Sequence, residues 1–540
     1  MFSNLNPIPA LPRYPGPHKV GSTEFEVPIS EISSESPVPD ANITTVKFRL
    51  FYPTSPSASS KQTTYWLPSP QRQWTHAYAS FLGANSRLSN FVSRLPSLVN
   101  YTTLPVVTDA PLLQNLRSQN YPLILFSHGL GGNFNTYSAI CGSLASCGIV
   151  CAAPEHRDGS APMSIVRKSY NEVATTIPYQ KHSHSPSKEV LDARIAQLRV
   201  RLWELELVFT VLNGINKGQK YTNLAEPPAT LKRDSTETPE FQGTFDMRPG
   251  HVTFAGHSFG AASIVQFVKT VYHHKHLPRL SPSQAEDPSW RPLYSPTTDS
   301  ELVKQITPST PVALLDLWTM PLRGETTQWL WEKPLPSYDR ISEGSHSDVP
   351  NTIAIMSTEF YRWTDLLNRT KALLSRRPAE TLQHLQHGKT ATGSASVSEA
   401  PAASRLPDDI TKSAPSPSSS ADPSPSPSPN ESEAPSPASS QSSLPLPNSD
   451  PAEPFLYTIP NSAHLSQSDF GVLFPNLTRY LMKAQEPENT ILLNIRAILA
   501  VMRGQGLEVE SAGNLKADED TILKENGDIQ RWRRLSLGSQ

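Results

Sequence analysis

The sequence predicts an α/β fold with a mostly parallel central sheet and helices on both faces. Short apolar runs typical of buried strands recur along the chain, and segments with helical spacing separate them. One of these strands, 252–255, is followed by a serine between two glycines and then by an apolar helix. Alternating strands and helices favour parallel pairing, because each helix returns the chain to the edge of the sheet from which the next strand starts.

Each element has its own signature, in chain order. Residues 46–52 alternate apolar and polar side chains, as a half-buried strand does. Short runs typical of buried strands follow at 123–126, 149–153, 252–255, 312–315, 352–356 and 455–459. Apolar spacing predicts helices at 137–145, 189–212, 363–374 and 491–502.

Changes in composition predict one folded domain with interruptions. Residues 376–453 are rich in serine and proline and lack the apolar side chains that offset an ordering entropy of roughly 1–2 kcal/mol per residue. We expect them to form a disordered insertion within the domain, because they lie between a predicted helix and the last predicted strand. The α/β domain then comprises residues 1–375 and 454–510, and residues 511–540 form a polar C-terminal tail. A second polar stretch, 275–296, is expected to be a surface insertion.

Charge and cysteine content exclude several classes of protein. The chain has 540 residues and a formal net charge of −2, which gives no attraction to nucleic acid. Its three cysteines, Cys141, Cys147 and Cys151, are odd in number and have no metal-ligand partners beside them. They indicate reduced, buried thiols in a cytosolic protein and not a disulfide framework.

No membrane anchor is predicted. The proline-rich start is not a signal peptide, Phe2 excludes N-myristoylation and residues 537–540 are not a prenylation box. The sequence also has no run of about 18 apolar residues that would span a bilayer. We therefore expect a cytoplasmic protein whose contact with membranes is peripheral. The sequence leaves its oligomeric state open.

The most informative motif is Gly256-His257-Ser258-Phe259-Gly260, which joins a predicted strand to a predicted helix. Glycines flank the serine because side chains at these two positions would collide with neighbouring backbone in so tight a turn. The pattern matches the nucleophile elbow of α/β-hydrolases. We therefore predict an α/β-hydrolase fold in which Ser258 is the catalytic nucleophile.

A serine nucleophile needs a base and an acid that orients the base, and in this fold the acid and then the base follow the serine along the chain. Asp316 directly follows a predicted buried strand and is the predicted acid. Glu359, just past the next strand, is the alternative acid. His464, in the loop after the last predicted strand, is the predicted base. We expect the side chain of His257 to point away from this base.

An oxyanion hole needs two backbone N–H groups aimed at the developing negative charge. Phe259, the residue after the nucleophile, is expected to supply one. Leu130 is expected to supply the other, because glycines at 129, 131 and 132 let the backbone of this turn approach closely. An ordinary glycine-rich turn is the alternative. No H-E-x-x-H or comparable cluster of ligands is present, so we predict no metal and no cofactor.

Eight short motifs occur in a characteristic order. They lie at 16–21, 51–53, 126–131, 137–140, 155–158, 256–260, 315–318 and 462–464. In this order they resemble the platelet-activating factor acetylhydrolase family of the plasma and type II intracellular kind. The resemblance extends over about residues 16–504, with two interruptions.

This resemblance implies a calcium-independent serine esterase. Its substrate would be the sn-2 acetyl or short, oxidised acyl ester of a glycerophospholipid, and its partner a phospholipid at a membrane or lipid surface. The two insertions, and the lack of a secretion signal and of a myristoylation site, are departures from the animal enzymes. Family members reach lipid with an apolar surface helix, whereas helix 189–212 is better explained as part of the core.

Two other functions are compatible with the sequence. A related α/β-hydrolase could act on another ester, such as a polyester or a dienelactone-like ester. An inactive scaffold could bind partners through the proline-rich segment. The presence of Ser258, Asp316, His464 and the glycine-rich turn together argues against the scaffold, because an inactive protein has no need of all four.

Overall fold

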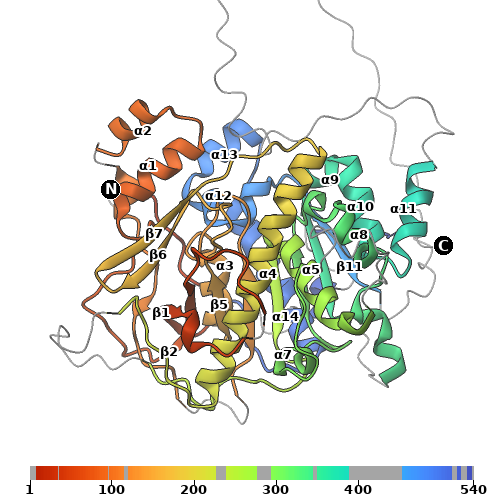
Figure 1. Cartoon of the computed structure of the whole chain (residues 1–540), viewed down its shortest axis with the longest axis horizontal. Coiled ribbons are helices and arrows are strands. Elements are labelled where there is room, and N and C mark those ends of the chain that lie inside the picture. The colour runs from red at the N-terminus through yellow and green to blue at the C-terminus, as the bar shows by residue number, and fades with distance from the viewer. Residues whose placement is uncertain are drawn as a thin grey trace, which may run out of the picture.

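A mixed sheet of ten strands organises the described part of the chain (Figure 1). The computed structural model describes residues 8–34, 36–94, 97–114, 120–226, 239–276, 293–343, 349–387, 453–513, 520–523 and 532–537. Successive neighbours at the centre of the sheet pair in parallel, in the order β5 (Val150–Pro154), β4 (Leu123–Ser127), β8 (Thr253–His257), β9 (Val312–Leu315), β10 (Thr352–Ser357) and β11 (Phe455–Ile459).

The two sides of this parallel centre are completed differently. On one side β2 (Thr45–Thr54) pairs antiparallel with β5 and with β1 (Lys19–Pro28), and β3 (Val107–Thr108) lies beside β1. On the other side β12 (Arg533–Arg534) pairs antiparallel with β11. Between its short outer strands the sheet therefore has the order β1-β2-β5-β4-β8-β9-β10-β11. A sharp turn joins β8 directly to the helix that begins at Phe259. This is the α/β-hydrolase fold, as predicted.

Helices cover both faces of the sheet, and the alternation of side chains along each strand explains why. Leu123 and Leu125 of β4 pack in one core with α4 (Lys188–Asn216) and α5 (Phe259–Tyr272). Ile124 and Phe126 pack in the other core with α3 (Ser138–Ser146) and α14 (Pro487–Gly504). In Figure 1, α4 and α5 lie in front of the sheet. A strand buried on both faces must be apolar at every position, which is the run that the sequence contains.

All of the strands and helices predicted from apolar patterns are present. The helix predicted at 363–374 is α10 (Thr364–Leu374). The further helices are α1 (Gln71–Phe81), α2 (Ser86–Val92), α7 (Glu301–Gln305), α8 (Glu325–Trp331), α9 (Thr358–Arg362), α11 (Pro378–His387), α12 (Asp469–Leu473) and α13 (Pro475–Met482). A separate hairpin joins β6 (Met163–Ser169) to β7 (Glu172–Pro178). Within the described residues, no helix is both long enough and apolar enough to cross a bilayer. The three cysteines are buried.

Three predicted boundaries are wrong. The segment 376–453 was expected to be disordered, but it begins with helix α11, on which Leu382 packs against the core; residues 388–452 lie outside the described residues. The expected polar tail, 511–540, supplies strand β12 and the buried side chains of Ile522, Leu523 and Leu537. The expected insertion 275–296 ends in two buried residues, Leu293 and Tyr294, while 277–292 lie outside the described residues. In each case a few apolar side chains bind the segment to the domain.

Candidate active site

Ser258 lies at the sharp turn between β8 and α5. Its backbone has φ 57° and ψ −116°, a strained conformation that is rare outside glycine. A Cβ on Gly256 would lie 2.5 Å from the carbonyl carbon of Gly260, and a Cβ on Gly260 would lie 2.0 Å from the carbonyl oxygen of Ser127. Both glycines are therefore required by neighbouring backbone, as predicted. The turn holds the Ser258 side chain, which is 5% exposed, at the carboxyl end of the parallel strands.

Asp316 occupies the equivalent place at the end of β9 and is completely buried. Its backbone N–H donates to Ile355 O on β10 at 2.8 Å, which fixes the start of the loop. Oδ1 accepts the N–H of Ser357 at 2.6 Å, and Oδ2 lies 2.9 Å from Nδ1 of His464. Burying a carboxylate is costly unless it is paired, and both oxygens here have a partner.

His464 follows β11 and opens the short helix η9 (His464–Gln467). Its backbone N–H donates to Oε2 of Glu359 at 2.9 Å, while its ring contacts Asp316. The ring stacks on Phe360 at a centroid distance of 4.1 Å and an interplanar angle of 5°. The two predicted acids therefore both contact His464, but at different atoms: Asp316 orients the imidazole and Glu359 holds the main chain.

His257 contradicts the prediction that its side chain points away from the base. Its ring lies 4.4 Å from the ring of His464, centroid to centroid. Nδ1 is hydrogen-bonded to Tyr137 Oη at 2.7 Å. Burial, and to a smaller extent the neighbouring His464, holds the pKa of His257 well below its usual range. The His257 ring beside the predicted base is therefore neutral. His257 is the last residue of β8, and its ring lies on the side of the sheet where Tyr137 is hydrogen-bonded to it; the loop that carries His464 reaches the same side.

The turn after β4 lies directly beside Ser258. A Cβ on Gly129 would lie 3.0 Å from Cβ of Ser258, so only glycine allows this approach. Gly129 N–H donates to Tyr137 Oη at 3.1 Å, and Gly131 N–H donates to Ser160 O at 2.9 Å. Among the hydrogen bonds of the described residues, none is donated by the N–H of Leu130 or of Phe259. The role of these two N–H groups stays a prediction.

Three side chains at the site have the chemistry of metal ligands. Ligand atoms of His257, Asp316 and His464 lie within 4.8 Å of one another. The 2.9 Å between Nδ1 of His464 and Oδ2 of Asp316 is shorter than the roughly 3.3 Å implied by tetrahedral bonds of 2.0–2.1 Å to zinc. The pair fits a shared proton better than a shared ion.

A buried group of histidines and a glutamate lies beneath the turn, and no pattern in the sequence predicted it. His128 Nε2 accepts the N–H of His156 at 3.1 Å, and the His156 ring joins Ser127 Oγ to Glu204 Oε2 at 2.8 and 3.0 Å. Burial lowers the pKa of His128 to about 3 and raises that of Glu204 to about 8. The available signal was the motif at 155–158, which carried a family resemblance but no predicted role.

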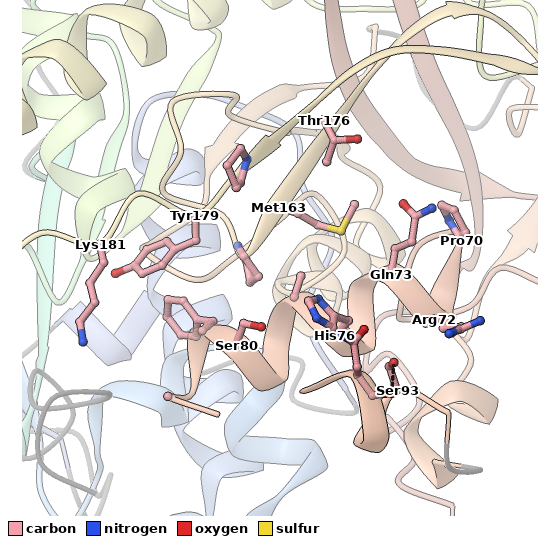
Figure 2. Close-up of a pocket in the computed structure, with 16 residues that line it drawn as sticks. Pro70, Arg72, Gln73, His76, Ser80, Ser93, Met163, Thr176, Tyr179 and Lys181 are labelled. Carbon is pink, nitrogen blue, oxygen red and sulfur yellow. Dashed lines mark hydrogen bonds between the residues drawn. The ribbon is translucent and has the colours of Figure 1, made fainter. Parts of the chain in front are cut away.

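A groove of about 830 Å³ lies between α1 and the β6–β7 hairpin, in the size range of a small-molecule site (Figure 2). Its walls are largely apolar, with Phe81, Met163 and Tyr179 among them. Figure 2 shows Arg72 and Lys181 at opposite ends of the groove. Ser258, Asp316 and His464 are not among its lining residues, but Phe81 is. The Phe81 ring packs closely on Gly131: a Cβ added to Gly131 would lie 2.6 Å from Cζ of Phe81. The side chain of Phe81 therefore lies between the groove and the turn beside Ser258.

Comparisons with known proteins show what the chain is similar to. A sequence profile described as "Platelet-activating factor acetylhydrolase, isoform II" matches residues 5–279, a range that contains Ser258. A Schizosaccharomyces pombe protein named "Putative phospholipase A2" is 32% identical over 266 residues, which are 47% of this chain and 58% of that protein. The platelet-activating factor acetylhydrolase of Bos taurus is 29% identical over 222 residues, 40% of this chain and 45% of that protein.

The matches are partial in length. The chain spans about half the length of the curated relatives it matches. Among solved structures, a ferulic acid esterase from Streptomyces cinnamoneus superposes with a TM-score of 0.41 at 12% identity, over 92% of each chain.

Proposed function

Because the chain belongs to the platelet-activating factor acetylhydrolase, isoform II family, we propose that it is a serine esterase that hydrolyses the sn-2 acetyl or short, oxidised acyl ester of glycerophospholipids. The observation that carries the proposal is the 2.9 Å hydrogen bond between His464 Nδ1 and Asp316 Oδ2, beside the elbow of Ser258. The bond joins residues from the ends of two strands far apart in the sequence. An orienting acid on an imidazole next to a strained serine is the arrangement that activates a hydroxyl nucleophile.

In the proposed reaction Ser258 Oγ attacks the acyl carbonyl carbon and its proton passes to Nε2 of His464. Asp316 stabilises the imidazolium that forms and keeps Nδ1 protonated. The N–H groups of Leu130 and Phe259 donate to the oxygen of the tetrahedral intermediate. The intermediate collapses, the bond between the acyl carbon and the sn-2 oxygen breaks, and His464 gives its proton to that oxygen as the lysophospholipid leaves.

The acyl-enzyme is then hydrolysed by the same groups. Water gives a proton to His464 and adds to the acyl carbon, and collapse of the second intermediate releases the short acid and returns the proton to Ser258. Each step needs a base and two N–H donors, and none requires a calcium ion.

A direct test combines labelling with a choice of substrates. A fluorophosphonate probe is expected to label the wild-type chain at Ser258, and 1-alkyl-2-acetylglycerophosphocholine is expected to be hydrolysed with a higher kcat/KM than p-nitrophenyl acetate. Labelling with a preference for the soluble ester would point to a different ester as substrate. An unlabelled, inactive protein would support a scaffold.

The groove beside the active site supports a phospholipid as substrate. Its lining residues, all within the described part of the chain, include Arg72, His76 and Lys181 and no aspartate or glutamate. A groove with apolar walls and cationic side chains suits a molecule that joins an alkyl chain to a phosphodiester.

Blocking this groove is expected to discriminate between the two ester substrates. Thr176 is exposed on β7 and lines the groove. We expect Thr176→Trp to raise KM for the phospholipid by about tenfold, which is the usual effect of losing one well-filled contact. The kcat/KM for p-nitrophenyl acetate, which does not fill the groove, should stay unchanged. Val173 is 47% exposed on the same strand and does not line the groove, so Val173→Trp is the matched control. Equal loss with both substrates would show that the groove does not bind the lipid.

Removal of metal ions is expected to leave activity unchanged. In the proposed mechanism Nδ1 of His464 and Oδ2 of Asp316 share a proton and are not available to an ion. Steady-state assays after dialysis against EDTA, and again after addition of calcium, measure this. Loss of turnover on chelation and its return with calcium would contradict the proposal.

We also propose a cytoplasmic protein that meets its substrate at a lipid surface. An odd number of cysteines, all three of them buried, supports a reducing compartment.

A further inference from the structure

Helix α4 buries a row of polar side chains next to the candidate active site. Arg194, Gln197, Arg201 and Glu204 are spaced three and four residues apart, which places them on one face of the helix, and all are at most 2% exposed. A buried guanidinium is costly unless its N–H groups are paired. The partners of Arg201 therefore indicate why it is there.

Arg201 donates hydrogen bonds to three different groups. Its Nε donates to Oδ2 of Asp158 at 2.6 Å and one Nη donates to Oγ of Ser160 at 2.5 Å. The other Nη donates to the backbone carbonyl oxygen of His128 at 2.8 Å. A planar guanidinium holds its N–H donors in several fixed directions at once, and a lysine ammonium does not reproduce this fork-shaped arrangement of donors.

These contacts hold both ends of the turn that contains Leu130. At its start, the carbonyl of His128 is fixed directly by Arg201. At its end, Gly131 N–H donates to the carbonyl of Ser160, whose side chain Arg201 also holds. The peptide N–H of Leu130 lies between these two fixed points.

The same guanidinium also contacts the other half of the site. Its central carbon lies 4.2 Å from the centroid of the Phe259 ring, a cation–π distance. Phe259 is the residue after Ser258, and its backbone N–H is the second N–H of the proposed oxyanion hole. One buried side chain thus joins the two segments from which the two donors come.

We propose that Arg201 is a positioning residue that aligns the N–H groups of Leu130 and Phe259 for the oxyanion. The proposal rests on the serine-esterase function proposed above. Arg201 touches no reacting atom. It acts by fixing two donors that are needed most in the transition state, so its loss affects kcat more than KM.

The test compares two buried arginines on the same helix. Arg201→Lys keeps the positive charge beside Asp158 but loses the fork. Arg194→Lys is the matched control, because Arg194 is equally buried, pairs with Gln197 and lies farther from the Phe259 ring, at 5.8 Å. Each variant is titrated with a fluorophosphonate probe, and kcat is expressed per titrated site on p-nitrophenyl acetate. A merely structural change lowers the number of titrated sites and the Tm but leaves this kcat unaltered.

We expect Arg201→Lys to lower kcat per titrated site by about tenfold to a hundredfold with KM almost unchanged, and Arg194→Lys to alter neither. An Arg201→Lys value close to that of the wild type, or an equal loss in Arg194→Lys, would overturn the inference. Should Arg201→Lys fail to fold, Ser160→Ala removes one contact of the guanidinium; a several-fold lower kcat per site supports the inference and an unchanged kcat overturns it. A wild-type chain that neither labels nor turns over would instead refute the esterase itself.

Discussion

Ser258→Ala is expected to lower kcat by roughly four to six orders of magnitude, the loss that follows removal of a triad nucleophile. The fold should be unaffected, because the backbone bonds of the elbow, from Ser258 N–H to Leu315 O and from Trp318 N–H to Ser258 O, do not involve the side chain. Turnover of the acetylated phospholipid and the Tm of the purified variant are the measurements.

A serine on the helix that follows the elbow provides the control. Ser263 is fully buried in α5, where its Oγ donates to the carbonyl of Phe259 at 2.8 Å. Ser263→Ala loses a hydrogen bond worth about 1 kcal/mol of stability but no reacting atom, so its activity should match that of the wild type. Turnover by Ser258→Ala within about tenfold of the wild type would disprove the role of this serine.

Asp316→Asn is expected to reduce kcat by about four orders of magnitude through the tautomer of His464. Ser357 N–H donates to Oδ1 of Asp316 at 2.6 Å. In the variant this donor fixes the orientation of the asparagine, because the amide oxygen and not the NH₂ group must take the place of Oδ1. The NH₂ group then faces Nδ1 of His464, which must become an acceptor, and the ring proton moves to Nε2. A protonated Nε2 cannot take the proton of Ser258.

The asparagine variant should fold, since asparagine tolerates the φ of 44° at this position as well as aspartate does. Glu359→Gln is the comparison. Its amide oxygen can still accept the N–H of His464, so activity should remain within about tenfold of the wild type. A crippled Glu359→Gln beside a mild Asp316→Asn would show that the acid has been misassigned.

The central sheet and the order of the candidate triad could be predicted because their signals are local. A parallel strand buried on both faces must be an apolar run, and the loop at its carboxyl end is where this class of sheet builds a site. Ser258, Asp316 and His464 each follow such a run. Their proximity required no knowledge of the long segments between them, since β8, β9 and β11 lie within four successive parallel strands that end at the same edge of the sheet.

What the sequence did not predict depends on partners far away in the chain. Arg201 and Glu204 break the apolar pattern of their helix, and only their partners at residues 128 and 156–160 explain why they are buried. Strand β1 was missed for the same reason: Glu26 reads as a solvent-facing residue but is buried against Thr45 and Arg157. Helix α11 was hidden because the serine- and proline-rich composition that follows it dominated the prediction for the segment.

Strand β12 has a consequence for self-association. It pairs antiparallel with β11, which would otherwise present the backbone donors and acceptors of an uncovered edge. Such an edge is a template for a second chain, and natural proteins blunt it with short, charged strands. The two residues of β12 are both arginines, and Arg534 lies 4.2 Å from the ring of Phe455, so the cover places positive charge where a second molecule would dock. We therefore expect this segment of only two residues to disfavour intermolecular pairing at Tyr457 and Thr458 of the strand that delivers His464.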